Sequence, residues 1–366
     1  MLAPARTAMP PLSKSAKHGV ISMRGNRNME PRNYKQIYKQ FRRQILTAQS
    51  ALIVAHDYPD PDCIASALGI KRLLDHWGIE KSTICYGGFV GRSENQAMMR
   101  LLNIKAKPYF LVDRHEYERI ILVDAYPGNG NVSLPKNLLI DAVIDHHPRN
   151  EDTHMVHFCD IRQNVGATST IVTEYLLQAR CPIDAPLATA LFYGIKTDTH
   201  SMGHHASSED LQYYKFLFDV VDHKLLYQIG HPGREKEYFR ILHNSVESLV
   251  YVNQVGFAHM GRVSSPDYIA EIADLFFRMP ELEWMVTSGF FNGHLFYSVR
   301  SKNSADSGEI AEYLAEKLHG SGGGHDRMAA GRVKLDDAGE EKLLDAFKSA
   351  LTGYFNISLD QGDKII

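Results

Sequence analysis

The sequence has few cysteines, no long apolar run and little net charge, and each of these features excludes some classes of protein. Only four of its 366 residues are cysteines, scattered without a CxxC pair, which indicates free thiols in a reducing compartment. No apolar run approaches the roughly 18 residues needed to cross a bilayer, so we predict a cytoplasmic protein with no membrane partner. The formal net charge of -3 provides no global basic field, so any polyanion must bind in a local cleft.

Length and composition favour two domains. A chain of 366 residues with 44% hydrophobic content can bury more than one sizeable core. Residues 1–32 are basic, contain several Pro, Ser and Gly, lack the apolar core of a secretory signal and show almost no apolar periodicity, which predicts a disordered tail. A basic arm that touches nucleic acid is the alternative, and Met23 and Met29 are alternative starts of the reading frame.

One stretch organises the chain: His-Asp-Tyr-Pro-Asp-Pro-Asp over residues 56–62, between an apolar run and a helical pattern. This order predicts a strand, a tight turn and a helix, since each proline restricts its own φ and the residue before it. His56, Asp60 and Asp62 then lie at the carboxyl end of a strand, where open α/β sheets place their sites. Imidazole and carboxylate donors suit Mn²⁺, Mg²⁺ or Fe²⁺. An aspartate that only caps the helix is the alternative.

Further segments repeat this pattern. Asp124 follows the apolar run 119–123, His146 and His147 follow Asp145 at the end of another apolar run, and Asp198 ends a predicted helix. Neighbouring parallel strands lie about 4.8 Å apart, so residues at their carboxyl ends converge. Clustered carboxylates repel one another unless a cation neutralises them. The repetition therefore favours a metal site over a series of unrelated caps.

The remaining pattern predicts an α/β fold. We expect an N-terminal domain over residues 33–210 with a mostly parallel sheet flanked by helices, and strands that include 138–144 and 155–159. A helical linker over 211–245 joins it to a smaller α/β domain over 246–355, in which Asn292-Gly293 marks a hairpin. A polar tail over 356–366 follows.

The second chemical feature is the run Gly-Ser-Gly-Gly-Gly-His at residues 320–325. Glycines let the backbone approach a phosphate, and their N–H groups can form an anion-binding nest, so this run predicts a phosphate-binding loop. A loop that merely connects two elements is the alternative. Arg92, in an earlier loop, is within reach of a phosphate in one interpretation and an ordinary surface arginine in the other.

With Asp145-His146-His147 and the Gly-Gly-Gly-His run, the chain resembles the DHH phosphoesterases from about residue 34 to 355. Within that family it is similar to two-domain, RecJ-like oligoribonucleases that also dephosphorylate 3′-phosphoadenosine 5′-phosphate (pAp). The resemblance implies two divalent ions, most often Mn²⁺, with Mg²⁺, Fe²⁺ and Co²⁺ as alternatives. It assigns the ligands by position: one ion to His56, Asp60 and Asp124, and the other to Asp62, Asp124, His146 and Asp198.

The resemblance also implies that Asp124 bridges the ions, and that residues of the second domain bind the substrate. Beside the metal ligands, we expect His147 to contact the scissile phosphate and Asp145 to orient a histidine. In the second domain, Arg300, Gly322, Gly323, Gly324 and His325 bind the substrate. Two departures stand out: Cys63 replaces a common alanine, and we interpret it as packed, while the unusual histidines 200, 204 and 205 are left outside the metal shell.

The predicted function is therefore that of a dinuclear-metal phosphodiesterase. It hydrolyses short oligonucleotides, such as linear dinucleotides, to 5′-mononucleotides and acts on pAp. Alternatives are a cyclic dinucleotide phosphodiesterase, a pyrophosphatase, and a catalytically inactive nucleotide-binding regulator. The last would predict a missing ligand, and all six are present. The predicted partner is a short oligonucleotide, with a homodimer left open.

Overall fold

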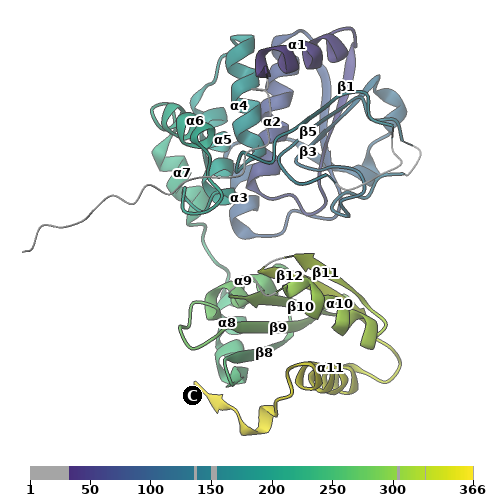
Figure 1. Ribbon diagram of the computed structural model, residues 1–366, viewed down its shortest axis with the longest axis vertical. Coiled ribbons are helices and arrows are strands. Elements are labelled where there is room, and N and C mark those ends of the chain that lie inside the picture. Colours follow the sequence, from purple (N-terminus) through teal and green to yellow (C-terminus); the bar gives the residue numbers. More distant parts are fainter. Residues whose placement is uncertain (1–32, 136–137, 150–154, 303–305, 326, 366) are drawn as a thin grey trace, which may run out of the picture.

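The computed structural model describes residues 33–135, 138–149, 155–302, 306–325 and 327–365, which form two domains, each around its own sheet (Figure 1). The predicted tail over residues 1–32 lies outside the described residues. The first domain contains α1 (Tyr34–Ile45), β1 (Ser50–Ala55), α2 (Pro61–His76), β2 (Lys81–Tyr86), α3 (Ser93–Leu101), β3 (Ala106–Pro108), η1 (Tyr109–Leu111), η2 (Arg114–Glu116), β4 (Arg119–Val123), β5 (Ala142–Asp145), β6 (Cys159–Ile161), α4 (Thr168–Ala179), α5 (Ala185–Asp198), α6 (Ser208–Phe218) and α7 (His223–Gly230).

The first sheet confirms the predicted parallel α/β architecture. Its strand order is β3-β2-β1-β4-β5-β6, and neighbouring strands pair in parallel. The order reverses direction between β1 and β4, whose last residues, Ala55 and Val123, are paired. The residues that follow these two strands therefore lie next to each other at the switch point, where open α/β sheets bind ligands.

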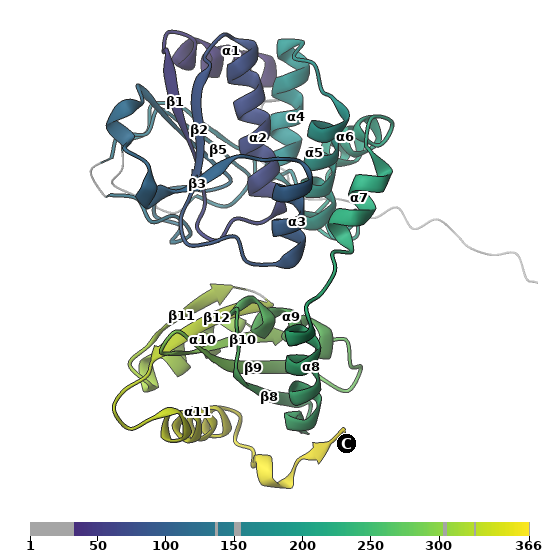
Figure 2. The same ribbon diagram turned by 180° about the vertical axis from the view of Figure 1, so that it is seen from behind.

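The two faces of this sheet are covered differently. Ile53 and Ala55 of β1 pack into the core formed with α2, α4 and α5, and these helices lie on one side of the sheet (Figures 1 and 2). Leu52 and Val54 point the other way, into a core that segments around η1, η2 and residue 134 help to cover. Because both faces are buried, β1 reads as a continuous apolar run.

Two predicted strands are displaced. The strand expected over 138–144 begins only at Ala142. Just before it, the Ile120 N–H of β4 donates at 2.9 Å to the buried Asp141 side chain instead of to a backbone carbonyl of a neighbouring strand. The strand expected over 155–159 is instead Cys159–Ile161, while Val156 forms only an isolated bridge with Ile140.

The second domain is built on a mixed sheet with the order β11-β12-β10-β9-β8-β7-β13. The Asn292-Gly293 hairpin between β9 and β10 is confirmed, and both residues have positive φ, 45° and 72°, as a tight hairpin turn requires. Its elements are α8 (Lys236–Ser248), β7 (Val250–Val252), β8 (Val255–Arg262), α9 (Asp267–Phe276), β9 (Trp284–Phe291), β10 (His294–Ser301), α10 (Ser307–Lys317), β11 (Ser321–His325), β12 (Met328–Lys334), α11 (Glu340–Phe355), η3 (Leu359–Gln361) and β13 (Asp363–Lys364).

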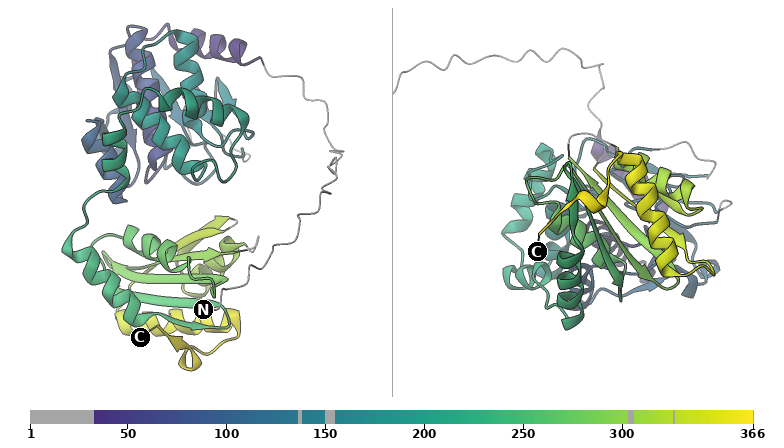
Figure 3. Two further views of the ribbon diagram at one scale, coloured as in Figure 1. Left: turned by 90° about the vertical axis from the view of Figure 1, so that its left-hand side faces the viewer. Right: turned by 90° about the horizontal axis from the view of Figure 1, so that it is seen from below.

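The segment predicted as a helical linker, 211–245, is helical but is divided between the two cores. Leu217 of α6 and Ile229 of α7 are buried in the first domain's core, whereas Ile241 of α8 is buried in a core of the second domain. Within the described residues, the chain crosses between the domains in the segment from α7 to α8 (Figure 3). Helical periodicity indicates which residues of a helix face a core, but it does not indicate which of two cores they join.

Two C-terminal expectations also change. The predicted glycine loop is the edge strand β11, in which Gly322 pairs with Gly331 of β12. The predicted polar tail carries β13, which pairs with β7 through Asp363 and Tyr251. Among the described helices, none has both the length and the apolar character needed to cross a membrane.

Candidate metal centre

Three adjacent strands deliver the predicted ligands to one edge of the first sheet. His56 follows β1, Asp124 follows β4, and His146 follows Asp145, the last residue of β5. These strands are neighbours in the sheet. The structure therefore brings together residues from three distant segments, as expected of the carboxyl edge of a parallel sheet.

The turn after β1 supplies the first two side chains. His56 Nε2 lies 3.7 Å from Asp60 Oδ1, and His56 Nδ1 lies 2.8 Å from the carbonyl of Asp57. Asp60 is also the N-cap of α2, since its Oδ1 accepts the Cys63 N–H at 2.9 Å, and Pro61 begins the helix. Asp60 is thus a cap in this structure, and its half-exposed carboxylate also faces the histidine.

Asp62 contacts the start of α4, which the sequence did not reveal. Its fully buried carboxylate accepts the backbone N–H groups of Thr168 at 2.6 Å and Ser169 at 2.8 Å. These groups open α4, where Ala167 at the N-cap offers no side-chain acceptor. Burial, followed by the charges of Asp124 and Asp198, raises the pKa of Asp62 well above its ordinary value. The Asp62 side chain therefore joins α2 to α4 next to the other acids of the site.

Asp124 lies at the centre of the cluster. Its carboxylate is fully buried: Oδ2 lies 3.6 Å from His56 Nε2, while Oδ1 lies 3.6 Å from His146 Nε2 and accepts a 2.8 Å hydrogen bond from Thr168 Oγ1. Burial alone would raise the pKa of Asp124, but His56, His146 and His147 outweigh it and hold the pKa below its ordinary value. One carboxylate thus directs its two oxygens toward two histidines from different strands.

The histidine pair after β5 divides its contacts. His146 Nε2 lies 3.4 Å from Asp198 Oδ2, at the end of α5. His147 Nδ1 lies 2.9 Å from Asp145 Oδ1, and its side chain is more exposed than that of His146, 36% against 14%. Burial and the charge of Asp60 raise the pKa of Asp198 to about 7, although His146 opposes the shift.

The arrangement fits divalent cations. Two clusters of possible ligand atoms share Asp124: one with His56 and Cys63, the other with His146 and His147. A third joins His146 to Asp62 and Asp198, and within each cluster the atoms lie within 4.8 Å of one another. Asp124 Oδ2 and His146 Nε2 are buried without a hydrogen-bond partner in the described chain, which is costly for polar atoms unless a ligand such as a cation satisfies them.

Cys63 is packed, as predicted, and it borders this centre. Its Sγ accepts the His56 N–H at 3.2 Å and faces the Val123 carbonyl at 3.5 Å. Burial raises the pKa of the thiol to about 12, so it stays protonated at neutral pH. A protonated, buried thiol is a poor nucleophile. All four cysteines are free, in agreement with their scattered positions.

The predicted substrate-binding residues lie in the second domain. Arg300, at the end of β10, is 5% exposed and donates through Nε to Asp274 at 2.5 Å. Gly322, Gly323 and Gly324 form part of β11, and the side chain of His325 lies outside the described residues. A Cβ on Gly322 would meet the Tyr297 hydroxyl at 2.4 Å, whereas one on Gly323 would meet nothing within 4 Å.

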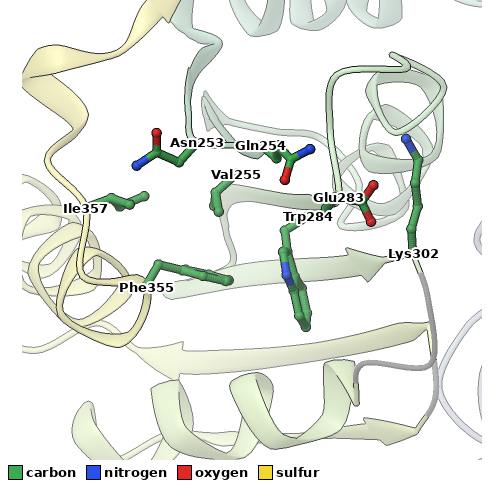
Figure 4. A pocket seen from close by; sticks show the side chains of 8 residues that line it. All are labelled: Asn253, Gln254, Val255, Glu283, Trp284, Lys302, Phe355 and Ile357. Atoms are coloured by element: carbon green, nitrogen blue, oxygen red, sulfur yellow. The ribbon is translucent and has the colours of Figure 1, made fainter.

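Two other features contain none of the predicted site residues. A pocket of about 380 Å³ in the second domain is lined by the β7–β8 turn, Trp284, Lys302 and the end of α11 (Figure 4). In the first domain His200, His204 and His205 are exposed, with the rings of His204 and His205 3.9 Å apart. The role of these histidines stays as predicted, outside the metal shell.

Sequence reasoning missed Thr168 and Ser169 as partners of the metal cluster. The available signal was the start of α4, where Gly166-Ala167 supplies no capping side chain. A helix that begins without a local acceptor needs one from elsewhere in the fold. Here the acceptor is the Asp62 carboxylate.

Two family models match the chain. The DHH family N-terminal domain matches residues 50–195, and the DHHA1 domain matches residues 257–354. The protein belongs to the DHH family and carries both domains.

Three individual relatives match part of the chain. An uncharacterized protein of Methanocaldococcus jannaschii, MJ1633, is 34% identical over 287 residues, 78% of this chain and 58% of that protein. The bifunctional oligoribonuclease and PAP phosphatase NrnA of Mycoplasma pneumoniae is 27% identical over 158 residues, 41% of this chain and 46% of NrnA. A probable manganese-dependent inorganic pyrophosphatase of Bacillus pumilus is 26% identical over 150 residues, 40% of this chain and 47% of that protein. The chain thus spans about half the length of these curated relatives.

One solved structure shares the fold over most of both chains. An exopolyphosphatase-related protein from Bacteroides fragilis superposes with a TM-score of 0.69 at 15% identity, covering 87% of this chain and 96% of that one. The two-domain arrangement therefore occurs in another protein of similar length.

Proposed function

We propose that this protein is a metal-dependent phosphodiesterase that hydrolyses short oligonucleotides, such as linear dinucleotides, to 5′-mononucleotides, and that it also acts on pAp. The observation that carries the proposal is the Asp124 carboxylate, whose two oxygens face His56 and His146. A carboxylate directed both ways suits a pair of divalent ions. The similarity to an oligoribonuclease and PAP phosphatase supports the substrate class.

In this proposal one ion is held by His56, Asp60 and Asp124, and the other by Asp62, Asp124, His146 and Asp198. Manganese is the preferred metal, supported by the manganese dependence named for the pyrophosphatase relative. Ions bound by these residues would supply an activated water as nucleophile and would offset the negative charge on the phosphate oxygens. No protein nucleophile is then needed, which agrees with the protonated state of the Cys63 thiol.

The residues around the metal ligands either orient a histidine or bind the substrate. Asp145 holds His147 through a 2.9 Å contact at Nδ1, which directs the other edge of the ring toward the scissile phosphate. Arg300 and the β11 glycines bind the substrate from the second domain, because a guanidinium pairs with two phosphate oxygens and an edge strand has backbone N–H groups on its unpaired side. We keep the cytoplasm as the predicted compartment and the homodimer as an open alternative.

A pyrophosphatase is the second candidate, because one relative of nearly equal identity carries that name. The matched DHHA1 domain, with its Gly-Gly-Gly-His strand, favours nucleotides. The discriminating experiment measures hydrolysis of pGpG, longer RNA, single-stranded DNA, pAp, cyclic dinucleotides and inorganic pyrophosphate, each with Mn²⁺. We expect the short linear substrates to be hydrolysed fastest. A strong preference for long DNA or for pyrophosphate would contradict the proposal.

A further inference from the structure

Helix α9 carries a stripe of acids that faces the first domain. Asp267, Glu271 and Asp274 are spaced by four and three residues, which places them on one side of the helix. The opposite side, including Ile269 and Ile272, is buried in the second domain's core. The acidic stripe is therefore left for contacts outside that core.

The first two acids meet the segment around the start of α3. A Cβ built on Gly91 would lie 2.1 Å from the Asp267 carboxylate oxygens, so the backbone there is in close contact with α9. Glu271 Oε2 accepts from Arg234 at 2.8 Å, and the same guanidinium donates to Ser93 and, at 2.6 Å, to Glu94. Arg234 belongs to the crossing between the domains, so it joins α3 to α9.

The third acid contacts arginines of both domains. Asp274 Oδ1 accepts from Arg300 Nε at 2.5 Å, and its Oδ2 lies 3.6 Å from a terminal nitrogen of Arg92. Arg92 follows β2, whose carboxyl end is next to that of β1, so it lies at the same sheet edge as His56. Arg300 is buried, and its Nη1 also donates to Ser298 Oγ at 2.6 Å and to the Val299 carbonyl at 3.0 Å, while the side chains of Asp274 and Arg92 are 40% and 47% exposed.

We propose that Asp274 is a positioning residue that holds Arg92 and Arg300, from the two domains, side by side as a joint binding site for one substrate phosphate. Two guanidinium groups that contact the same carboxylate repel each other, and that carboxylate offsets the repulsion. One positive charge remains, and the half-exposed Arg92 offers planar N–H donors that match phosphate oxygens. The Arg234 contacts fix the domain orientation in which the pair forms.

This inference rests on the proposed function, since it takes a terminal phosphate of a short oligonucleotide as the ligand. It assigns Arg92 to substrate binding, and it gives Asp274 a role besides its ion pair with Arg300. It also makes substrate affinity depend on the relative orientation of the domains, because the binding arginines come from both.

The test uses the full-length protein with Mn²⁺ and a 5′-phosphorylated dinucleotide. Asp274→Asn and Arg92→Gln should each raise KM about tenfold with little change in kcat, which corresponds to about 1.4 kcal/mol of binding. The double variant should raise KM no further than the larger single effect, because both changes disrupt one site. Asp274→Glu, which keeps the charge, should restore part of the affinity. Asp345→Asn, an exposed acid on α11, is the matched control and should behave as wild type.

Small-angle scattering separates positioning from domain opening. The Arg234 contacts remain in Asp274→Asn, so its radius of gyration should equal that of wild type. An increase would show that the substitution acts by opening the domains and would overturn the positioning role, as would a wild-type KM in both single variants. If wild-type protein hydrolyses none of the phosphodiesters with Mn²⁺, the proposed function itself fails, which is a different outcome.

Discussion

Thr168 Oγ1 donates a 2.8 Å hydrogen bond to Oδ1 of Asp124, so the first residue of α4 holds the carboxylate that follows β4. Both side chains are fully buried. Asp124 has φ = 56°, a left-handed conformation that few residues adopt, and aspartate tolerates it better than most. The hydroxyl therefore restricts the orientation of a side chain whose backbone is already in an uncommon conformation.

The first prediction concerns this hydrogen bond. Thr168→Val keeps the side-chain shape but removes the donor, so we expect Mn²⁺ affinity to fall about tenfold, the usual effect of losing a partner that orients a ligand. Calorimetric titration with Mn²⁺ measures it. Thr168→Ser retains the hydroxyl and should bind close to wild type. Equal affinity of the Val variant and wild type would contradict the positioning role.

The second prediction concerns Asp124 itself. Asp124→Asn replaces the shared carboxylate with a neutral amide of the same size, and asparagine also tolerates positive φ, so the fold should persist. Turnover of a dinucleotide at saturating Mn²⁺ should fall at least ~10²-fold, more than for loss of a supporting contact. Circular dichroism checks the fold. Wild-type turnover in this variant would disprove the two-ion mechanism.

The third prediction concerns metal removal. Asp62, Asp124 and His146 lie close together with Asp198, and burial raises the pKa of Asp62 and Asp198, which shows that this cluster disfavours its own negative charge. A bound cation relieves that cost only in the folded state. Mn²⁺ at about 100 times its Kd should therefore add about 2.7 kcal/mol to the free energy of unfolding, and EDTA should remove it. Thermal melts with and without Mn²⁺ measure the shift, and Asp124→Asn should show a smaller one.

The fourth prediction separates the glycines of β11. Gly322→Ala should lower Tm, because the new methyl would meet the Tyr297 hydroxyl at 2.4 Å and the Ala311 carbonyl at 2.5 Å. Gly323→Ala meets nothing within 4 Å and should leave Tm close to wild type while raising KM, if a phosphate approaches this backbone. Thermal melts and steady-state kinetics on both variants provide the comparison. An unchanged KM for Gly323→Ala would show that this glycine lies away from the substrate.

The fifth prediction concerns pH. His259 packs against Phe290 and contacts Ser288 Oγ at 2.9 Å, and burial lowers its pKa to about 4, helped by the charge of Lys348. Between pH 4 and 6.5 the unfolded chain then binds more protons at this residue than the folded chain does, so stability falls as the pH falls through this window. The loss should be on the order of 2–3 kcal/mol across it. Urea denaturation at several pH values measures the slope, which His259→Gln should reduce.

Part of the site could be predicted from local pattern. A short apolar run followed by an acid or histidine identifies the end of a buried strand, and the parallel arrangement then brings His56, Asp124 and His146 to one edge. The Asn292-Gly293 hairpin was equally local, since its conformation depends on two adjacent residues.

Other features depended on partners far along the chain. The glycines at 322–324 form a strand because β12 pairs with them, and no property of a glycine run predicts that pairing. The helices between residues 211 and 245 divide between two cores, which amphipathic periodicity cannot distinguish. Asp62 caps α4 from 106 residues away, and the uncapped start of α4 indicates that an acceptor is needed but not which residue provides it.

The sequence by itself therefore determined the class of fold and the donor atoms gathered at the carboxyl edge of the first sheet, because these follow from the periodicity and chemistry of short segments, and its motifs gave the resemblance to the family. Only the tertiary structure decided how the donors share their bonds: that Asp124 divides its oxygens between two histidines, that Asp62 also holds α4, and that Asp274 contacts arginines of both domains. The reason is physical. Hydrogen bonds and ion pairs form between atoms that are close in space, and for these residues the fold, not the neighbouring sequence, sets those distances.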